Sequence, residues 1–182
     1  MVEMLTKWSY LLPFTKTKEK LHLLHISREL GQNHTTARQH LNYFEEQGIL
    51  KKGYQGRLTL YWLNKNSDRL IDILTIIEKE KLIIKTKENL KLNELINEIQ
   101  KLTSEPTIIF GSSVEDFLNA NDIDILTTDN KLNLKEIEKK LNLKIHLIKV
   151  ESLKEIKESL RLEIIKKHLI INNTENIIKW LL

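Results

Sequence analysis

The hydrophobic positions of residues 1–66 recur first with a helical period and then with a strand period. Apolar side chains three or four positions apart indicate three helices: Met4–Leu12, Lys20–Leu30 and Thr35–Gln47. We expect Pro13 to stop the first helix, while Gly31 and Gly48 mark the ends of the other two. Alternating apolar and polar residues then indicate two strands joined by a short turn: Ile49–Lys52 and Arg57–Leu63.

Residues 67–182 follow a different pattern, in which helical stretches alternate with short apolar runs. The helical stretches are Asp68–Leu82, Leu90–Leu102, Leu134–Leu141, Leu153–Lys167 and Glu175–Leu182. The apolar runs, which are typical of buried strands, are Thr107–Phe110, Asp122–Thr127, Lys144–Val150 and His168–Ile171. The sequence therefore predicts an α+β protein with a helix-and-hairpin domain at 1–66, a connecting helix within 67–86 and a small α/β domain with a mixed sheet at 87–182.

The connecting helix carries regularly spaced aliphatic residues: Leu70, Ile73, Leu74 and Ile77. Because this is more apolar surface than one contact with a small domain requires, we expect a homodimer joined partly through this helix. No apolar run approaches the ~18 residues of a membrane span, so we expect no membrane partner. Cysteine is absent, which excludes disulfides and fits a cytoplasmic location.

The positive charge of the chain is concentrated in its first third. The net charge is +4, and residues 1–66 hold ten Lys and Arg against five Asp and Glu, whereas residues 67–182 hold nineteen against twenty. A basic excess confined to one segment indicates a polyanionic partner for that segment.

Residues 34–52, HTTARQHLNYFEEQGILKK, and residues 56–61, GRLTLY, arrive in the order of a helix, a strand and a returning strand. Together with the preceding helix, they resemble the winged helix-turn-helix of many prokaryotic regulators. The resemblance implies binding to double-stranded DNA, although winged helices also serve as protein-interaction modules.

The resemblance assigns the major groove of DNA to the third helix, because one helix fits this groove and its first turns reach the base edges. The residues expected there are Thr35, Thr36, Arg38 and Gln39, with Asn42 and Tyr43 one turn further on. The residues expected to contact phosphates from the hairpin are Lys51, Lys52 and Arg57.

A second motif lies in residues 108–126, IIFGSSVEDFLNANDIDIL. A strand, a Gly-Ser turn, a spacer and an Asp-x-Asp strand in this order resemble the small nucleotidyltransferases of the DNA polymerase beta superfamily. Alternation places Asp122 and Asp124 on one face of a strand, where two carboxylates can hold Mg²⁺ against a triphosphate. Gly111 lets the backbone approach a phosphate, and Ser112 and Ser113 belong to the turn that would donate hydrogen bonds to it.

The chain departs from this family's pattern at two places. Glu115 and Asp116 follow the Gly-Ser turn where the family has a stretch containing Arg-Gly. The family also supplies a third carboxylate from a later strand, but residues 144–150 hold no Asp or Glu. His146 is the inward-pointing polar residue of that strand, either as a ligand or as a packed histidine, and Glu151 is a more remote candidate.

The whole chain is similar to archaeal proteins that fuse a winged helix-turn-helix to a minimal nucleotidyltransferase domain. This similarity implies a transcriptional regulator whose second domain binds Mg²⁺ and ATP or another nucleotide without turnover. The alternative is an active, antitoxin-like enzyme that transfers a nucleotide to a protein or nucleic-acid acceptor, the protein acceptor being a separate chain. A third reading is a dimerisation module with neither activity.

Overall fold

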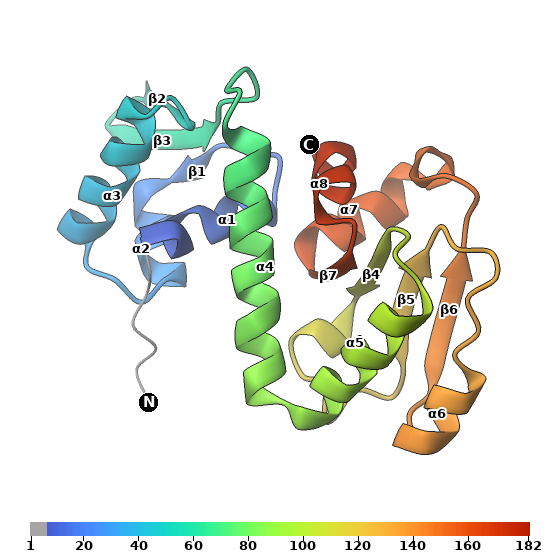
Figure 1. Ribbon diagram of the computed structural model, residues 1–182. Helices are drawn as coiled ribbons and strands as arrows, with labels where there is room; N and C mark the ends of the chain where they lie inside the picture. The colour runs from blue at the N-terminus through green and yellow to red at the C-terminus, as the bar shows by residue number, and fades with distance from the viewer. Residues whose placement is uncertain (1–6) are drawn as a thin grey trace. The chain divides into compact units, whose positions relative to one another are not determined.

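The computed structural model describes residues 7–182, which form two compact units (Figure 1). The first unit extends to Ile77 and includes Leu182, and the second runs from Glu78 to Leu181. The boundary lies within helix α4 (Leu70–Glu88), which starts later and ends later than the connecting helix predicted at residues 68–82. The protein is α+β, as predicted. Within residues 7–182, no helix is long and apolar enough to cross a membrane.

The first unit combines short helices with a three-stranded antiparallel sheet of order β1-β3-β2. Its helical elements are the 3-10 helix Lys7–Leu11, α1 (Leu12–Thr15), α2 (Leu23–Glu29) and α3 (His34–Glu46). Its strands are β1 (Leu21–His22), β2 (Leu50–Gln55) and β3 (Leu58–Leu63).

Two sequence predictions for this unit are wrong. Pro13 does not stop the first helix but lies in the first turn of α1, where its missing N–H has no helical partner to lose. The predicted start of that helix at residue 4 lies outside the described residues. The second predicted helix starts only at Leu23, because residues 21 and 22 pair with Tyr61 and Leu60 of β3. This long-range strand pairing overrides the local helical period.

A capping residue sets the start of helix α3, and a stripe of apolar residues sets the side that it buries. Asn33 caps its start, since the Asn33 Oδ1 atom accepts a hydrogen bond of 2.8 Å from the backbone N–H of Thr36. Ala37, Leu41 and Phe44 form one buried stripe, so the opposite side of the helix faces solvent.

The second unit is built on a four-stranded mixed sheet of order β6-β5-β4-β7. Its strands are β4 (Thr107–Phe110), β5 (Ile123–Thr127), β6 (Ile145–Lys149) and β7 (His168–Asn172). Strand β4 is antiparallel to both of its neighbours, whereas β5 and β6 are parallel and connected through a helix. The helices after α4 are α5 (Leu90–Leu102), α6 (Lys135–Leu141), α7 (Glu158–Lys166) and α8 (Thr174–Leu181).

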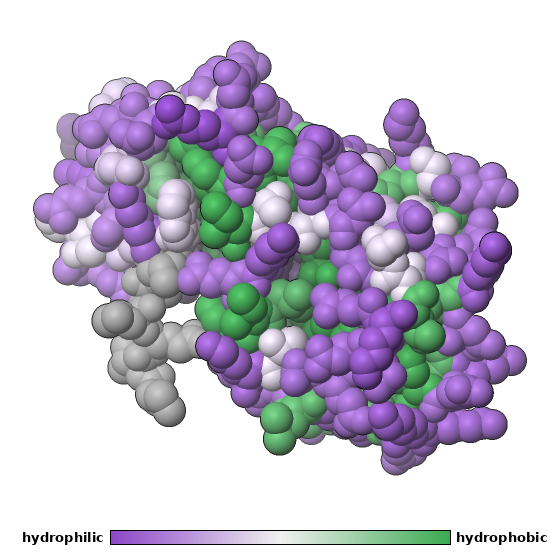
Figure 2. Space-filling model, in the orientation of Figure 1, coloured by the Kyte–Doolittle hydropathy of each residue, from purple (hydrophilic) through white to green (hydrophobic). Residues whose placement is uncertain are grey.

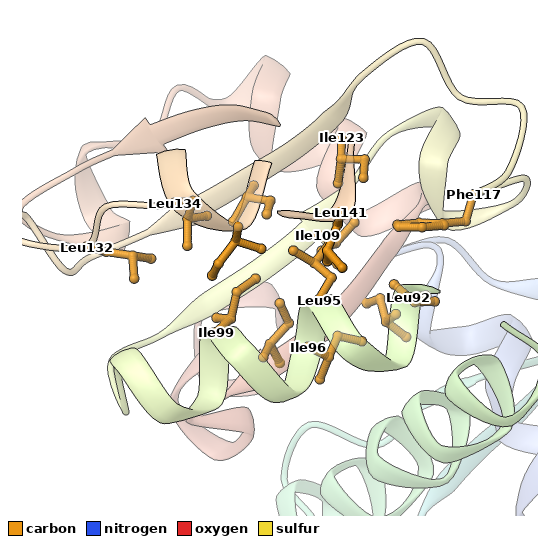
Figure 3. Packing of buried hydrophobic residues seen from close by; sticks show 14 residues of the cluster. Leu92, Leu95, Ile96, Ile99, Ile109, Phe117, Ile123, Leu132, Leu134 and Leu141 are labelled. Atoms are coloured by element: carbon orange, nitrogen blue, oxygen red, sulfur yellow. The ribbon is translucent and has the colours of Figure 1, made fainter. Parts of the chain in front are cut away.

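One face of this sheet packs against α5 and α6 and forms the core of the unit (Figure 3). Leu95 and Ile99 of α5 lie against Ile109 of β4, and all three are fully buried. The helix predicted at residues 153–167 is interrupted, because only Leu153–Glu155, as a 3-10 turn, and α7 are helical. Another short 3-10 helix occurs at Ser112–Val114.

A buried polar cluster lies at β7. His168 and Glu78 are each 1% exposed, and the His168 Nε2 and Glu78 Oε1 atoms are 3.3 Å apart. Lys81 Nζ lies 2.9 Å from the other carboxylate oxygen of Glu78. Burial acts to raise the pKa of Glu78, but the positive charge and hydrogen bond of Lys81, together with the nearby His168, hold this pKa well below its ordinary value.

Candidate nucleic-acid surface and nucleotide site

Three of the residues predicted to read DNA form an exposed row on α3. Thr35, Arg38 and Gln39 are exposed and lie on the side of the helix opposite its buried stripe. Thr36 is half-buried, and its backbone N–H is engaged by the Asn33 cap. The row therefore presents a hydroxyl, a guanidinium and an amide to solvent from the first two turns.

Asn42 and Lys52 are used within the unit. The Asn42 Oδ1 atom accepts hydrogen bonds from Lys52 Nζ at 2.9 Å and from the Tyr61 hydroxyl at 2.8 Å. Burial raises the pKa of Tyr61, which holds this hydroxyl in its neutral, donating form. These bonds fasten α3 to the hairpin, so Asn42 positions the helix and keeps only its amide nitrogen for another partner.

The hairpin that follows α3 carries exposed basic residues. Lys51 and Arg57 are exposed, on β2 and at the β2–β3 turn respectively. Tyr43, the last residue predicted to read bases, is 37% exposed and lies under the Lys7 ammonium, whose Nζ is 3.0 Å from the ring centroid. The sequence did not indicate that Leu58, beside the turn, is 50% exposed.

The Gly-Ser turn of the second unit directly follows β4. Gly111 has φ 81° and ψ −153°, a conformation that only glycine adopts readily. A Cβ atom on Gly111 would lie 3.0 Å from the Asp124 Oδ2 atom, so the absence of a side chain lets the Asp124 carboxylate lie against the turn. Ser112 is exposed, whereas Ser113 is buried and its hydroxyl donates to the Phe110 carbonyl at 3.4 Å. Of the two serines, Ser112 is the one placed to meet a ligand.

The two aspartates lie where β5 begins, one beside a side chain of β6 and the other beside the residue that precedes β6. Asp124 pairs in register with His146, and the Asp124 Oδ1 and His146 Nδ1 atoms are 2.9 Å apart. Asp122 immediately precedes β5, and its Oδ2 atom is 3.8 Å from Lys144 Nζ. The sequence predicted His146 as an inward-pointing residue, but its side chain is 63% exposed. Lys144 was not predicted, and it becomes a neighbour of Asp122 only through the parallel register of the two strands.

The acidic residues after the turn are engaged with other groups. Glu115 forms an ion pair of 2.7 Å with Lys167. The Asn119 side chain donates to Asp116 at 2.8 Å, and this bond, with that from the Asn119 backbone, lowers the pKa of the Asp116 carboxyl. The lysine beside Glu115 offsets part of the negative charge that would oppose a phosphate at this turn.

The donor set fits Mg²⁺ only if a nucleotide completes it. Within residues 7–182, no group of three or more His, Cys, Asp or Glu side chains is arranged to hold a metal ion. Mg²⁺ is nevertheless commonly held by one or two carboxylates together with substrate phosphates and water. Asp122 and Asp124 meet that smaller requirement.

A pocket of about 330 Å³ adjoins Asp122. Phe117 and Leu118 provide apolar walls, and Lys91 and Lys144 place positive charge at its edge. Its volume falls in the usual range of ~300–1,000 Å³ for small-molecule sites.

Comparison of the chain with known proteins adds no further identification: no protein-family model matches it, and neither the curated proteins nor the solved structures yield a significant match.

Proposed function

We propose that this protein binds double-stranded DNA through its first unit, which we interpret as a winged helix-turn-helix, and acts as a transcriptional regulator. The observation that carries the proposal is the exposed row Thr35, Arg38 and Gln39 on a helix whose other side is buried. Helix α3 and the preceding α2 supply the helix-turn-helix, and β2 and β3 supply the wing.

The chemistry of the exposed row suits base edges. Arginine pairs with the two acceptors of guanine, glutamine pairs with adenine, and the threonine methyl contacts thymine. Lys51 and Arg57 would add contacts to phosphates, which position the protein without reading sequence. The basic excess of this unit agrees with such a polyanionic partner.

The DNA proposal predicts different effects for two substitutions in the full chain. We expect Arg38→Ala to weaken binding to the preferred DNA sequence by about 1–3 kcal/mol and to weaken binding to random duplex DNA much less. Lys51→Ala should weaken both about equally and lower the slope of log K against log salt by about 0.9. Fluorescence anisotropy across a salt series measures both effects, with Lys139→Ala on α6 as an exposed control. Absence of binding at low salt would refute the proposal.

We propose further that the second unit is a divergent nucleotidyltransferase fold that binds a Mg²⁺-nucleotide such as MgATP. Strand β4, the Gly111 turn and β5 bring the Asp124 carboxylate against the turn, where the triphosphate would lie. Asp122 and Asp124 would hold the metal, while Ser112 and the backbone N–H groups of the turn would donate to phosphate oxygens. The pocket beside Asp122 offers room for the rest of the nucleotide.

Binding without turnover is the better form of this proposal, because the residues beside the two aspartates are His146 and Lys144, and the strand expected to supply a third carboxylate carries none. The second candidate is active transfer of a nucleotide to a protein or nucleic-acid acceptor. The pocket beside Asp122 favours it, since the pocket could also receive an acceptor group. Transfer of radiolabel from [α-³²P]ATP to any macromolecule would establish the enzyme. Nucleotide binding without any transfer of label would favour binding without turnover.

We also propose that two copies pair through α4. Leu70, Leu74 and Ile77 are buried and therefore not available to a partner, but Ile76 and Ile83, one heptad apart, are about half exposed. In an antiparallel pair Ile76 of one copy would face Ile83 of the other, and Asp72 would face Lys87.

Pairing through α4 predicts a two-chain mass by light scattering at micromolar concentration. We expect Ile83→Glu to give a one-chain mass, because the charge would enter the apolar seam twice. Lys85→Glu, at a half-buried position on the opposite side of the helix from Ile83, tests whether any added negative charge on this helix has the same effect. A one-chain mass for the unmodified protein would refute the pairing.

A further inference from the structure

Strand β6 forms one edge of the four-stranded sheet (Figure 1). The Lys144 carbonyl accepts from Ile123 N–H at 2.9 Å, and Val150 N–H donates to the Thr127 carbonyl at 3.1 Å. The even-numbered residues from 144 to 150 therefore direct their backbone N–H and C=O groups towards β5. Residues 145, 147 and 149 direct theirs away from the sheet. The outward N–H of Ile145 donates to Glu138 Oε1 at 2.8 Å, which leaves the segment around Leu147 as the open part of the edge.

A groove of about 460 Å³ runs beside the same residues. Its apolar walls are Leu132, Leu134, Ile145 and Leu147, and its basic residues are Lys131, Lys135 and Lys149. Of the described lining residues, Glu138 is the acidic one, and its carboxylate is engaged by Ile145 N–H. A hydrophobic strip with hydrophilic side chains around it lies in Figure 2 where β6 runs in Figure 1.

We propose that this edge binds an extended acidic segment of a partner protein, which adds a strand beside β6. The outward N–H and C=O groups near Leu147 would supply main-chain hydrogen bonds. Because side chains alternate along a strand, one face of the segment would place apolar residues in the groove, and acidic residues would meet the lysines. An unprotected edge of this kind is otherwise a site of unwanted pairing.

The charge of the groove selects this occupant over a second copy of the chain. Pairing β6 with β6 of another copy would bring two sets of groove lysines close together, and these like charges would repel one another. An acidic segment has the opposite charge and the same backbone geometry. This surface is independent of the proposed nucleotide and DNA sites, so its test does not depend on theirs.

The test uses the full chain and a fluorescein-labelled peptide of alternating Glu and Val, with blocked ends. We expect saturable binding by fluorescence anisotropy that weakens as salt rises. A peptide of the same composition with its Val residues grouped together, and one with Lys in place of Glu, should bind at least tenfold more weakly.

Two variants test the backbone and charge components separately. Leu147→Pro removes an N–H that points away from β5, at a position where an edge strand tolerates proline. Because it also removes a side chain of the groove, Leu147→Ala, which keeps the N–H, is its matched control, and circular dichroism verifies that both variants fold. Lys131→Glu/Lys135→Glu changes only exposed side chains. We expect Leu147→Pro and Lys131→Glu/Lys135→Glu each to lower the affinity for the alternating peptide at least tenfold. Lys139→Glu, on α6 outside the groove, should leave this affinity unchanged. The proposal would be overturned if the parent did not bind the peptide at low salt, or if Lys131→Glu/Lys135→Glu and Lys139→Glu both bound it as tightly as the parent. It would also be overturned if the chain self-associated and the lysine substitutions strengthened that self-association.

Discussion

Replacement of Asp124 by Asn is expected to abolish the Mg²⁺-dependent part of ATP binding, measured by calorimetry on the full chain with and without the metal. Asp124 is the carboxylate that lies against the Gly111 turn, and Asp122 is the only other described carboxylate assigned to the proposed metal. Mg²⁺ gives up its bound water reluctantly, so a two-carboxylate site that loses one carboxylate binds the ion weakly.

Matched substitutions separate loss of the metal from loss of the fold. Glu136→Gln makes the same carboxylate-to-amide change at an exposed position on α6 and should leave ATP binding intact. His146→Ala should retain or strengthen binding, because it frees the Asp124 Oδ1 atom for the metal. DNA binding should survive in all three variants. If the parent chain shows no Mg²⁺-dependent binding, the nucleotide proposal is wrong and the DNA proposal stands on its own test.

Gly111→Ala provides a second route to the same result. The added Cβ would lie 3.0 Å from Asp124 Oδ2, and alanine adopts the φ of 81° only with strain of about 1–3 kcal/mol. We therefore expect weaker nucleotide binding together with a lower melting temperature. Asp124→Asn should leave the melting temperature nearly unchanged, so the two variants are distinguishable.

Replacement of Glu78 by Ala is expected to destabilise the second unit by about 3 kcal/mol, near the lower end of the range for breaking a buried ion pair. The lower end applies because Lys81 is 14% exposed and can reach water once its partner is removed. His168, 1% exposed, would lose the carboxylate 3.3 Å away. For a chain of this size we expect the melting temperature to fall by roughly 6–12 °C.

Thermal melts followed by circular dichroism measure this loss, with Glu136→Ala as the exposed control. Glu78→Gln should fall between the parent and Glu78→Ala, because it keeps the shape and loses the charge. The folded-state pKa of Glu78 is lowered, so its stabilising effect is present above the ordinary glutamate pKa of about 4.3 and is lost as pH falls through the folded value. The difference in stability between the parent and Glu78→Ala should therefore be constant near neutral pH and shrink as the pH falls below about 4.3. Equal melting temperatures at pH 7 would show that the cluster contributes nothing.

Local patterns in the sequence determined where many of the helices and strands of this protein lie. The helical period located α3 and α5, short apolar runs located the four strands of the second sheet, and Asn33 and Gly48 lie at the ends of α3 that their chemistry favours. The resemblance of residues 108–126 to a nucleotidyltransferase motif also implied that Gly111 and Asp124 belong to one site, and the two residues lie together in the structure. Each of these inferences depends on residues that are close in the chain.

Only the tertiary structure decided which side chains meet across long separations. The pairing of residues 21 and 22 with β3 converted the start of a predicted helix into a strand. The parallel register of β5 and β6 placed Lys144 and His146 beside the two aspartates, and the folding of the hairpin turned Asn42 and Lys52 into partners of each other. Likewise, Glu78 acquired its partner His168 only when β7 packed against it. Helical and strand periods report which face of an element is apolar, but register and partner depend on the packing of elements that the local pattern does not describe.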